Sequence, residues 1–434
     1  MGSEWRSTTL GQVVEEGGGF IQTGPFGSQL HASDYVAKGI PTIMPANMAN
    51  NRVDITGIAR ITEEDAERLS KHIVQPDDIV YSRRGDVTLK ALIRESDEKM
   101  ICGTGCLLVR PGKGIDPKFL TYHLSSPQNQ EWIIRHAIGA TMPNLNQGIL
   151  SNVPLHVPSI SIQKAIAHIL GTLDDKIELN RQMNATLEAM AQALFQSWFV
   201  DFDPVIDNAL AAGHPIPDAL QERAAARAAL GHRRQPLPAA IQSQFPSSFV
   251  RHEEMGWVPA GWAVARIGDV LELAYGKSLP ATRRLEGSVP VYGSGGISGF
   301  HTEHFVNGPG IVVGRKGTVG SLYWVEDNFF PIDTVFFVIN KSHTPLYWLY
   351  QTLKRIDIKS MGADSAVPGV NRNAVYAKPI IIPNVTAFKG YLAQIEPNNL
   401  KRRELEDQIK TLATLRDTLL PKLLSGAVRV AAAG

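Results

Sequence analysis

Cysteine is almost absent from this sequence of 434 residues, which contains only Cys102 and Cys106. A zinc site would need two more ligands at a recognisable spacing, and the neighbouring sequence offers none. Both cysteines stand in an apolar stretch, ICGTGCLLV. We therefore expect two buried, reduced thiols rather than a metal site.

Long apolar runs are also missing. No stretch approaches the roughly 20 apolar residues that span a bilayer, and no charged segment followed by an apolar one opens the chain. The composition, with 44% hydrophobic and 20% charged residues, is typical of a globular protein. These features predict a cytoplasmic protein without a membrane partner, and the length predicts two or three domains.

Neither sign of charge is in excess, because 43 Lys and Arg residues stand against 42 Asp and Glu residues. The first 160 residues contain 15 basic and 17 acidic side chains. A surface that binds nucleic acid would therefore have to be local rather than spread over the whole protein.

Motifs of catalysis are missing as well. Residues 276–278 (GKS) do not complete a phosphate-binding GxxxxGK[ST] loop, because Leu271 stands where its first glycine belongs. No NPP[YF] or DPP[YF] run is present to hold a flipped base, and no HExxH pair. The acidic pair Asp174 and Asp175 is expected to be solvated on a helix. We expect a chain that is not an enzyme and binds no cofactor or metal ion itself.

A repeat is present at a shift of 225 residues. Residues 153–158 (VPLHVP) reappear as residues 378–383 (KPIIIP), and the same shift takes Asn146 to Asn371. A proline-bracketed run and an asparagine that share one shift indicate two related halves.

Nearer the start of each half the shift is larger. Trp5 corresponds to Trp262 at a shift of 257, and residues 83–85 (RRG) correspond to residues 315–317 (RKG) at a shift of 232. Insertions in loops change shifts in this way, so the halves share a fold and differ in their loops. This pattern is typical of two related binding modules with different targets.

The sequence of each half predicts the same order of elements. Short strands come first, such as Ile79–Ser82 and residues 310–313. A proline-bracketed strand that suits a sheet edge follows, and a long helix comes last. The predicted fold is α+β. Two similar mixed α/β domains are each followed by a long helix, and the helices pair as an antiparallel coiled coil with pseudo-twofold symmetry. The expected segments are the first domain 1–160, first helix 161–200, connector 201–258, second domain 259–385, and second helix with tail 386–434.

The first helix has a heptad seam between residues 162 and 199. Its positions are Ile166, Leu170, Leu173, Ile177, Asn180, Asn184, Leu187, Ala191, Leu194 and Trp198. The second helix, expected over residues 399–420, has a seam of Leu405, Ile409, Leu412, Leu415 and Leu419. The alternative for each helix is packing on its own domain.

Prolines delimit the second helix in this prediction. Pro397 precedes its start, Asn398 or Asn399 serves as N-cap, Pro421 interrupts it and Gly426 ends what remains. The prediction therefore makes the second helix shorter at its start than the first.

The connector, residues 201–258, is rich in Ala, Pro and Arg and predicts one or two short helices. Arg233 and Arg234 in it either touch DNA or belong to a solvated linker.

Several strings of the sequence resemble one family, the DNA-specificity subunits of Type I restriction-modification systems. The most specific are residues 255–262 (MGWVPAGW) and 415–426 (LRDTLLPKLLSG). Weaker matches are residues 81–86 (YSRRGD), 139–146 (GATMPNLN) and 187–195 (LEAMAQALF). The resemblance extends from about Trp5 to Val430 and includes the order domain, helix, domain, helix.

The resemblance implies a subunit without activity of its own that binds double-stranded DNA. Each domain would read one half of a split, asymmetric site. Two methyltransferase subunits, and through them the restriction subunits, would be its partners. Those partners would use S-adenosylmethionine, ATP and Mg, none of which this chain would bind. The runners-up are a DNA-binding adaptor of another defence system and a scaffolding module that does not bind DNA.

Basic residues at two predicted loop tips are candidate DNA contacts. Arg83 and Arg84 in the first half, and Arg315 and Lys316 in the second, follow short strands and precede a glycine. Arginine is suited to bidentate recognition of guanine edges or phosphate. The alternative is a solvated turn or an ion pair.

Other polar residues in these regions complete the candidate set. They are Thr141, Asn144, Asn146, Lys277, Thr318, Asn371 and Arg372. For Asn146 and Asn371 the alternative is that they cap a turn.

The end of the first helix is a candidate docking surface for the methyltransferase. Its residues are Met190, Leu194, Phe195, Trp198 and Phe199. The alternative is that these side chains pack within the coil.

Overall fold

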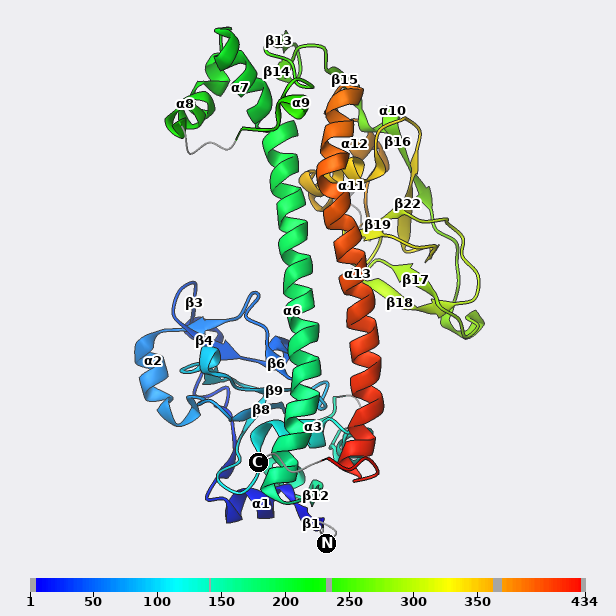
Figure 1. The fold of residues 1–434 in the computed structure, drawn as a ribbon. Coiled ribbons are helices and arrows are strands. Elements are labelled where there is room, and N and C mark those ends of the chain that lie inside the picture. Colours follow the sequence, from blue (N-terminus) through cyan, green and yellow to red (C-terminus); the bar gives the residue numbers. More distant parts are fainter. Residues whose placement is uncertain (1–4, 140–141, 232–235, 362–368, 431–434) are drawn as a thin grey trace. The chain divides into compact units, whose positions relative to one another are not determined.

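The computed structural model describes residues 5–139, 142–231, 236–361 and 369–430 (Figure 1). The chain forms two compact units. Unit 1 is Met1–Gln182 with Leu405–Gly434, and unit 2 is Met183–Glu404.

Two helices of 40 residues each, α6 (Ile160–Phe199) and α13 (Val385–Leu424), are shared between the units. One part of each helix belongs to unit 1 and the other part to unit 2.

Unit 1 is built on an antiparallel four-stranded sheet in the order β2-β11-β8-β9. The central strands are continuous apolar runs and are buried, as strands covered on both faces must be. The four strands are Phe20–Thr23, Cys106–Arg110, Ile79–Ser82 and Lys90–Leu92.

A second sheet of unit 1 has the order β10-β4-β7-β3, with β10 parallel to β4. Its strands are Ile101–Cys102, Ile40–Ile43, Arg60–Ile61 and Tyr35–Val36, and a hairpin of β5 (Met48–Ala49) and β6 (Arg52–Val53) lies beside β9. Cys102 and Cys106 are buried and unbridged, which confirms the expected thiols, and burial raises the pKa of both.

Unit 2 repeats the first sheet in the order β16-β22-β19-β20. Its strands are Leu271–Tyr275, Val335–Asn340, Gly310–Gly314 and Leu322–Val325. The second sheet differs, having three strands in the order β18-β17-β21, which are Gly296–His301, Val289–Gly293 and Phe330–Pro331. The predicted α+β fold with two similar domains is therefore confirmed.

The proline-bracketed strands form two-stranded sheets in both units. β12 (Pro154–Val157) pairs with β1 (Arg6–Thr9), and β23 (Pro379–Ile382) pairs with β15 (Ala263–Arg266). Proline lacks an N–H to donate, so it is tolerated at the start of such an edge strand.

Short helices surround the sheets in the same order in both units. Unit 1 has α1 (Leu10–Glu16), α2 (Glu63–Arg68), α3 (Pro117–Leu124), α4 (Pro127–His136) and α5 (Gln147–Ser151). Unit 2 has α10 (Ile267–Val270), α11 (Leu346–Arg355) and α12 (Arg372–Tyr376) in the places of α1, α3 and α5.

The long helices pack antiparallel in both units, as predicted. In unit 1 the side chains of Asn180 and Gln408 meet at 3.1 Å, and Asp174 meets Arg416. In unit 2 Glu188 meets Arg402. All ten seam positions predicted for α6 are buried or half-buried.

The predicted start of the second helix is wrong, because α13 begins at Val385 and continues through Pro397 and Pro421. A proline inside a helix costs about 3 kcal/mol. Before Pro397, the side chains of Phe388, Tyr391 and Ile395 are buried in the core of unit 2. Burial of such side chains contributes about 1.5–3 kcal/mol each, which outweighs the cost of the proline.

The predicted seam of the second helix also needs one correction. Leu415 is 45% exposed, whereas Leu405 is buried and Leu412 and Leu419 are half-buried. Arg416 takes the seam position and pairs with Asp174. The heptad spacing of apolar residues predicted Leu415 at this seam position instead.

The connector is folded. It forms α7 (Asp203–Ala212), α8 (Gln221–Ala229), α9 (Ala239–Gln242) and a hairpin of β13 (Phe249–His252) and β14 (Gly256–Pro259). Arg223 and Arg227 of α8 form ion pairs with Asp203 and Asp207 of α7. Arg233 and Arg234 lie outside the described residues.

In the part of the chain that the structure describes, no helix combines the length and the apolar character needed to cross a membrane.

Candidate nucleic-acid interface

The predicted basic pairs occupy the same place in both units, directly after the third strand of the first sheet. The N–H of Arg83 donates to the carbonyl of Gly105 at 2.8 Å, and the N–H of Arg315 donates to the carbonyl of Thr334 at 3.0 Å. Both loops then turn through a glycine, Gly85 or Gly317, with φ of 76°. That left-handed conformation is accessible to glycine without strain.

A second loop, distant in sequence, meets each basic pair. In unit 1 the N–H of Leu145 donates to the carbonyl of Arg83 at 2.8 Å, and Arg84 forms a β-bridge with Asn144. In unit 2 the N–H of Val370 donates to the carbonyl of Arg315 at 3.3 Å.

The matching bridge in unit 2 joins Lys316 and Gly369. The bridge in unit 1 therefore brings together two predicted residues, Arg84 and Asn144, whereas in unit 2 the equivalent place is taken by Gly369, which was not predicted. Thr141 lies outside the described residues.

Asn146 and Asn371 are helix N-caps. The side-chain oxygen of Asn146 accepts from the N–H of Ile149 at 2.8 Å, at the start of α5. That of Asn371 accepts from the N–H groups of Asn373 at 3.0 Å and Ala374 at 3.2 Å, at the start of α12. The capping alternative thus describes both residues, and their amide oxygens are engaged in holding the loop.

Aromatic rings accompany the arginines, and sequence reasoning missed them. In unit 2 the guanidinium carbons of Arg315 and Arg372 lie 4.8 and 4.5 Å from the ring centroid of Tyr275. In unit 1 the guanidinium carbon of Arg83 lies 5.9 Å from the ring centroid of Phe26. A cation over an aromatic face is attracted by the ring quadrupole.

The two rings are exposed to solvent, at 50% for Tyr275 and 54% for Phe26. Tyr275 is the last residue of β16, and Phe26 follows the end of the equivalent strand β2. Their common place at the end of the first strand of the sheet was the signal in the sequence that could have identified them.

The arginines of unit 2 are also held by backbone carbonyls. Arg315 donates to the carbonyl of Asp333 at 2.9 Å, and Arg372 donates to that of Leu273 at 3.1 Å. A guanidinium has five N–H donors in a fixed plane, so these single bonds orient the group and leave other donors for a ligand.

Exposed polar residues surround these groups. Arg84, Lys316 and Thr318 are exposed on the loops after β8 and β19. Lys277 follows Tyr275 by two residues, which brings it to the same edge of the sheet, and its ammonium lies 6.0 Å from the ring of Phe305. Each unit thus presents a local group of cations and exposed aromatic rings, the chemistry that suits phosphates and base edges.

Lys90, by contrast, is a buried cation. It lies on β9 with its ammonium 5.6 Å from the ring of Tyr81. Burial lowers the pKa of Lys90 to about 7, against a small opposite effect of Asp86. Its ammonium donates to the carbonyl of Thr88 at 3.4 Å, so this lysine belongs to the interior of unit 1 rather than to its surface.

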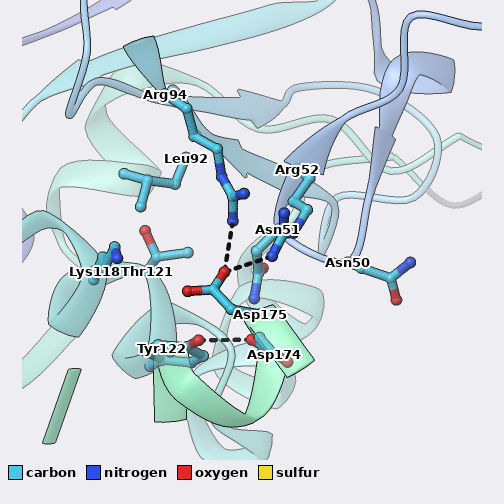
Figure 2. Close-up of a pocket in the computed structure, with 11 residues that line it drawn as sticks. Asn50, Asn51, Arg52, Leu92, Arg94, Lys118, Thr121, Tyr122, Asp174 and Asp175 are labelled. Atoms are coloured by element: carbon cyan, nitrogen blue, oxygen red, sulfur yellow. Dashed lines mark hydrogen bonds and ion pairs between the residues drawn. The ribbon is translucent and has the colours of Figure 1, made fainter. Parts of the chain in front are cut away.

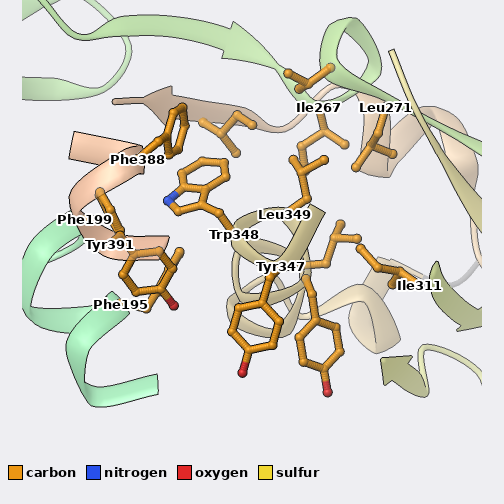
Figure 3. Packing of buried hydrophobic residues seen from close by; sticks show 14 of the residues in the cluster. Phe195, Phe199, Ile267, Leu271, Ile311, Tyr347, Trp348, Leu349, Phe388 and Tyr391 are labelled. Carbon is orange, nitrogen blue, oxygen red and sulfur yellow. The ribbon is translucent and has the colours of Figure 1, made fainter. Parts of the chain in front are cut away.

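The predicted docking surface on α6 needs correction. Phe195, Trp198 and Phe199 are buried in the core of unit 2, and Leu194 is half-buried against it. Figure 3 shows Phe195 and Phe199 beside Trp348 and Tyr391. Large aromatic side chains gain most from burial, so they complete the core of the unit instead of forming an exposed face. Met190, 54% exposed, is the one residue of this set on the surface.

Of the acidic pair of α6, Asp175 is exposed as expected, whereas the side chain of Asp174 is largely buried, which corrects the prediction for that residue. Asp174 and Asp175 line a small pocket of unit 1 between the helix and the sheet domain (Figure 2). Asp175 accepts from Arg52 at 2.8 Å, and Asp174 accepts from the hydroxyl of Tyr122 at 2.6 Å. Arg52 belongs to β6 and Tyr122 to α3, and sequence spacing does not reveal these contacts.

Comparisons with known proteins identify the family of the chain. The profile of the family described as "Type I restriction modification DNA specificity domain" matches residues 2–189 and 259–390. The chain is similar to the Type I restriction enzyme HindI specificity subunit of Haemophilus influenzae, at 26% identity over 84% of this chain and 89% of that protein. It is also similar to the MjaIX specificity subunit of Methanocaldococcus jannaschii, at 24% identity over 92% of this chain and 88% of that protein.

A solved structure shares the fold. The S subunit of a Type I restriction-modification system from M. genitalium has a TM-score of 0.51 and 18% identity, with 96% of each chain covered. The family profile covers more than half of the chain and both repeated domains. This protein therefore belongs to the family of Type I restriction-modification DNA-specificity subunits.

Proposed function

We propose that this chain is the DNA-reading, non-catalytic subunit of a Type I restriction-modification complex, and that its two domains read the two halves of a split DNA site. The observation that carries the proposal is the pair of equivalent loop groups. In unit 1 Arg84 bridges Asn144 and Arg83 lies over Phe26, and in unit 2 Arg315 and Arg372 lie over Tyr275, with Lys316 on the same loop.

The proposed site is asymmetric because the two loop groups have different side chains. Guanidinium groups form bidentate hydrogen bonds with guanine, and amides do so with adenine. Two different sets on one chain favour two different half-sites, whereas identical subunits would favour a palindrome.

The long helices are proposed as the spacer between the half-sites. Each has 40 residues, which corresponds to about 60 Å at 1.5 Å per residue. Their seam is packed along both units, and a packed helix pair resists bending better than a single helix.

The proposed partners are double-stranded DNA, two methyltransferase subunits and, through these, the restriction subunits. S-adenosylmethionine, ATP and Mg are assigned to the partners and none of them to this chain. Met190 remains a candidate contact for the methyltransferase because it is exposed on α6. The proposal assigns the complex to the cytoplasm, where host DNA is methylated.

The experiment that tests the proposal is the adenine-methylation map of the host before and after deletion of the gene, in a host with an active partner methyltransferase. We expect one split asymmetric motif to lose its methylation. An unchanged map would contradict the proposal and favour an adaptor of another defence system or a module that does not bind DNA. Neighbouring genes for a methyltransferase and a helicase-nuclease would separate the same alternatives.

A second experiment tests whether the domains act independently. Residues 1–160 are replaced by the corresponding domain of another specificity subunit. We expect one half of the methylated motif to change and the other to stay. A change in both halves would show that the domains do not read DNA as separate modules.

A further inference from the structure

Two tyrosines at a shift of 225 residues, Tyr122 and Tyr347, occupy the same place on α3 and α11. Each meets a carboxylate of α6 that is also bound by an arginine of α13. We propose that these two tyrosine–carboxylate–arginine sets are positioning residues that fix the orientation of each sheet domain on the long helices and thereby the gap length that the protein accepts in its DNA target. This inference rests on the proposed function.

In unit 1 the set consists of Tyr122, Asp174 and Arg416. The hydroxyl of Tyr122 donates to one oxygen of Asp174 at 2.6 Å, and the guanidinium of Arg416 donates to the other at 2.7 Å. Tyr122 is only 7% exposed. One carboxylate thus joins the sheet domain, through α3, to both long helices.

The neighbouring Asp175 extends the unit 1 set. It accepts from Arg52 at 2.8 Å and lies 3.7 Å from Arg94 (Figure 2). Arg52 belongs to β6 and Arg94 follows β9, so two further parts of the sheet domain are fixed to the same turn of α6.

In unit 2 the set consists of Tyr347, Glu188 and Arg402. The hydroxyl of Tyr347 donates to Glu188 at 3.1 Å, and Arg402 donates to the same oxygen at 2.8 Å. Lys354 of α11 donates to the other oxygen at 2.9 Å. Here too the carboxylate comes from α6, the arginine from α13 and the tyrosine from the sheet domain.

The groups are in the protonation states that these bonds require. Burial, with the charge of Asp174 or Glu188 nearby, raises the pKa of both tyrosines, so each hydroxyl keeps its proton and donates. Burial alone would raise the pKa of Glu188, but the hydrogen bond from Lys354 and the charges of Arg402 and Lys354 lower it below its usual value.

Such a set contributes more to the orientation of the sheet domain on the long helices than to the stability of the fold. A buried ion pair often adds little net stability compared with apolar packing, because both charges lose their hydration. Its hydrogen bonds are directional, however, and a satisfied polar network favours one arrangement over its neighbours. The apolar core can tolerate a small tilt of a domain, whereas the directional hydrogen bonds on Asp174 and on Glu188 oppose it.

The test compares Tyr122→Phe and Tyr347→Phe with the natural chain, each assembled with its partner methyltransferase. Binding is measured on duplexes that contain the target with its natural gap and with one base pair more or fewer. Each tyrosine hydroxyl donates to a charged group, and such a hydrogen bond is stronger than one between neutral groups. We therefore expect the preference for the natural gap to fall by about tenfold in each variant.

Tyr376→Phe is the matched control. It also removes one hydroxyl from unit 2, but that hydroxyl accepts from the N–H of Leu273 at 2.8 Å inside the sheet domain and not from a long helix. We expect its gap preference to equal that of the natural chain. Melting temperatures of all three variants show whether each is folded.

The outcomes are distinct. A reduced gap preference in Tyr122→Phe and Tyr347→Phe, with the control unchanged, supports the inference. An unaltered preference, or an equal loss of affinity for all gaps, overturns it and leaves the sets a structural role only. If the natural chain reads no split site, the proposed function fails first, and the inference fails with it.

Discussion

Unit 1 and unit 2 share a scaffold and differ at its edge. The first sheet has the same strand order in both, and the same backbone hydrogen bonds hold the basic loop. At that loop, unit 1 places one arginine over Phe26, whereas unit 2 places two arginines over Tyr275. The duplicated backbone therefore gives both units the same loop position, and the side chains at that position differ between the units.

The second sheets differ more strongly. Unit 1 has four short strands there and unit 2 has three, and each sheet contains one parallel pair. These strands lie in the region where the shift between the halves changes. Loops at the surface change at little cost to the core. The strands of these sheets also contribute buried residues, such as Ile43, Ile61 and Ile101 in unit 1, which belong to its hydrophobic clusters.

The largest expected effect comes from lengthening both helices. One heptad is inserted after Gln182 in α6 and one after Glu404 in α13, at the border between the units. Contacts within each unit, such as that of Asn180 with Gln408, are kept. Seven residues add about 10.5 Å with little rotation.

We therefore expect the accepted gap to grow by about three base pairs at about 3.4 Å each, or binding to be lost. The measurement is methylation sequencing of a host that carries the variant. Methylation at the original gap would refute the role of the helices as spacer.

The next largest effect is expected for Arg372→Ala in unit 2. Loss of a bidentate base contact costs about 1–3 kcal/mol, which corresponds to about fivefold to more than a hundredfold weaker binding. We expect the second half-site alone to become relaxed, as measured with duplexes mutated at single positions. Arg83→Ala is the matched variant for the first half-site, and equal effects of the two on both half-sites would contradict the comparison.

Acid is expected to affect unit 1 first. Burial lowers the pKa of His72 to about 4, with a smaller effect of Lys71, and lowers that of His123 to about 4 as well. In the unfolded chain a histidine has a pKa of about 6.5. The folded state therefore binds fewer protons between about pH 6.5 and 4, and stability is lost as the pH falls through this range.

The expected loss at pH 5 is about 2 kcal/mol for each histidine. Hydrogen exchange followed by mass spectrometry at pH 7.5 and pH 5 measures it for each unit separately. His72→Leu removes one titrating group and should reduce the pH dependence of unit 1. An equal loss of protection in both units at pH 5 would argue against this assignment.

The smallest effect is expected for the aromatic rings. A cation–π contact at an exposed site contributes about 0.5–1 kcal/mol. Tyr275→Leu removes two such contacts and should weaken the second half-site by about fivefold, while Phe26→Leu removes one longer contact and should weaken the first by about twofold. Fluorescence anisotropy with labelled duplexes measures both, and a larger effect of Phe26→Leu would reverse the ranking.

Much of the site could be predicted because it follows short-range rules. Strand and turn patterns located the basic pairs at loop tips, and one repeat shift placed Asn146 and Asn371 in equivalent positions, where both cap a helix. The side chains that contact these residues could not be predicted. Phe26 and Tyr275 reach the arginines from other strands, and such contacts depend on strand order rather than on neighbouring sequence.

The long helices α6 and α13 also combine features that the sequence predicts with features that only packing decides. Their existence, pairing and seam in α6 follow from heptad spacing. The passage of α13 through Pro397, the place of Arg416 instead of Leu415 in the seam, and the burial of Phe195, Trp198 and Phe199 follow from packing. Local sequence rules indicate which secondary structure a segment favours. Packing of its side chains in the core determines whether the segment adopts that structure.

The sequence by itself thus determined the duplication, the strand and helix types, the family and the location of the basic loops. All of these depend on periodicity, turn residues and recurring strings. Only the tertiary structure decided which loops meet, which charges are buried and which aromatic residues are exposed. Those outcomes depend on free energies of burial and of hydrogen bonding between residues more than a hundred positions apart, such as Tyr347 and Glu188.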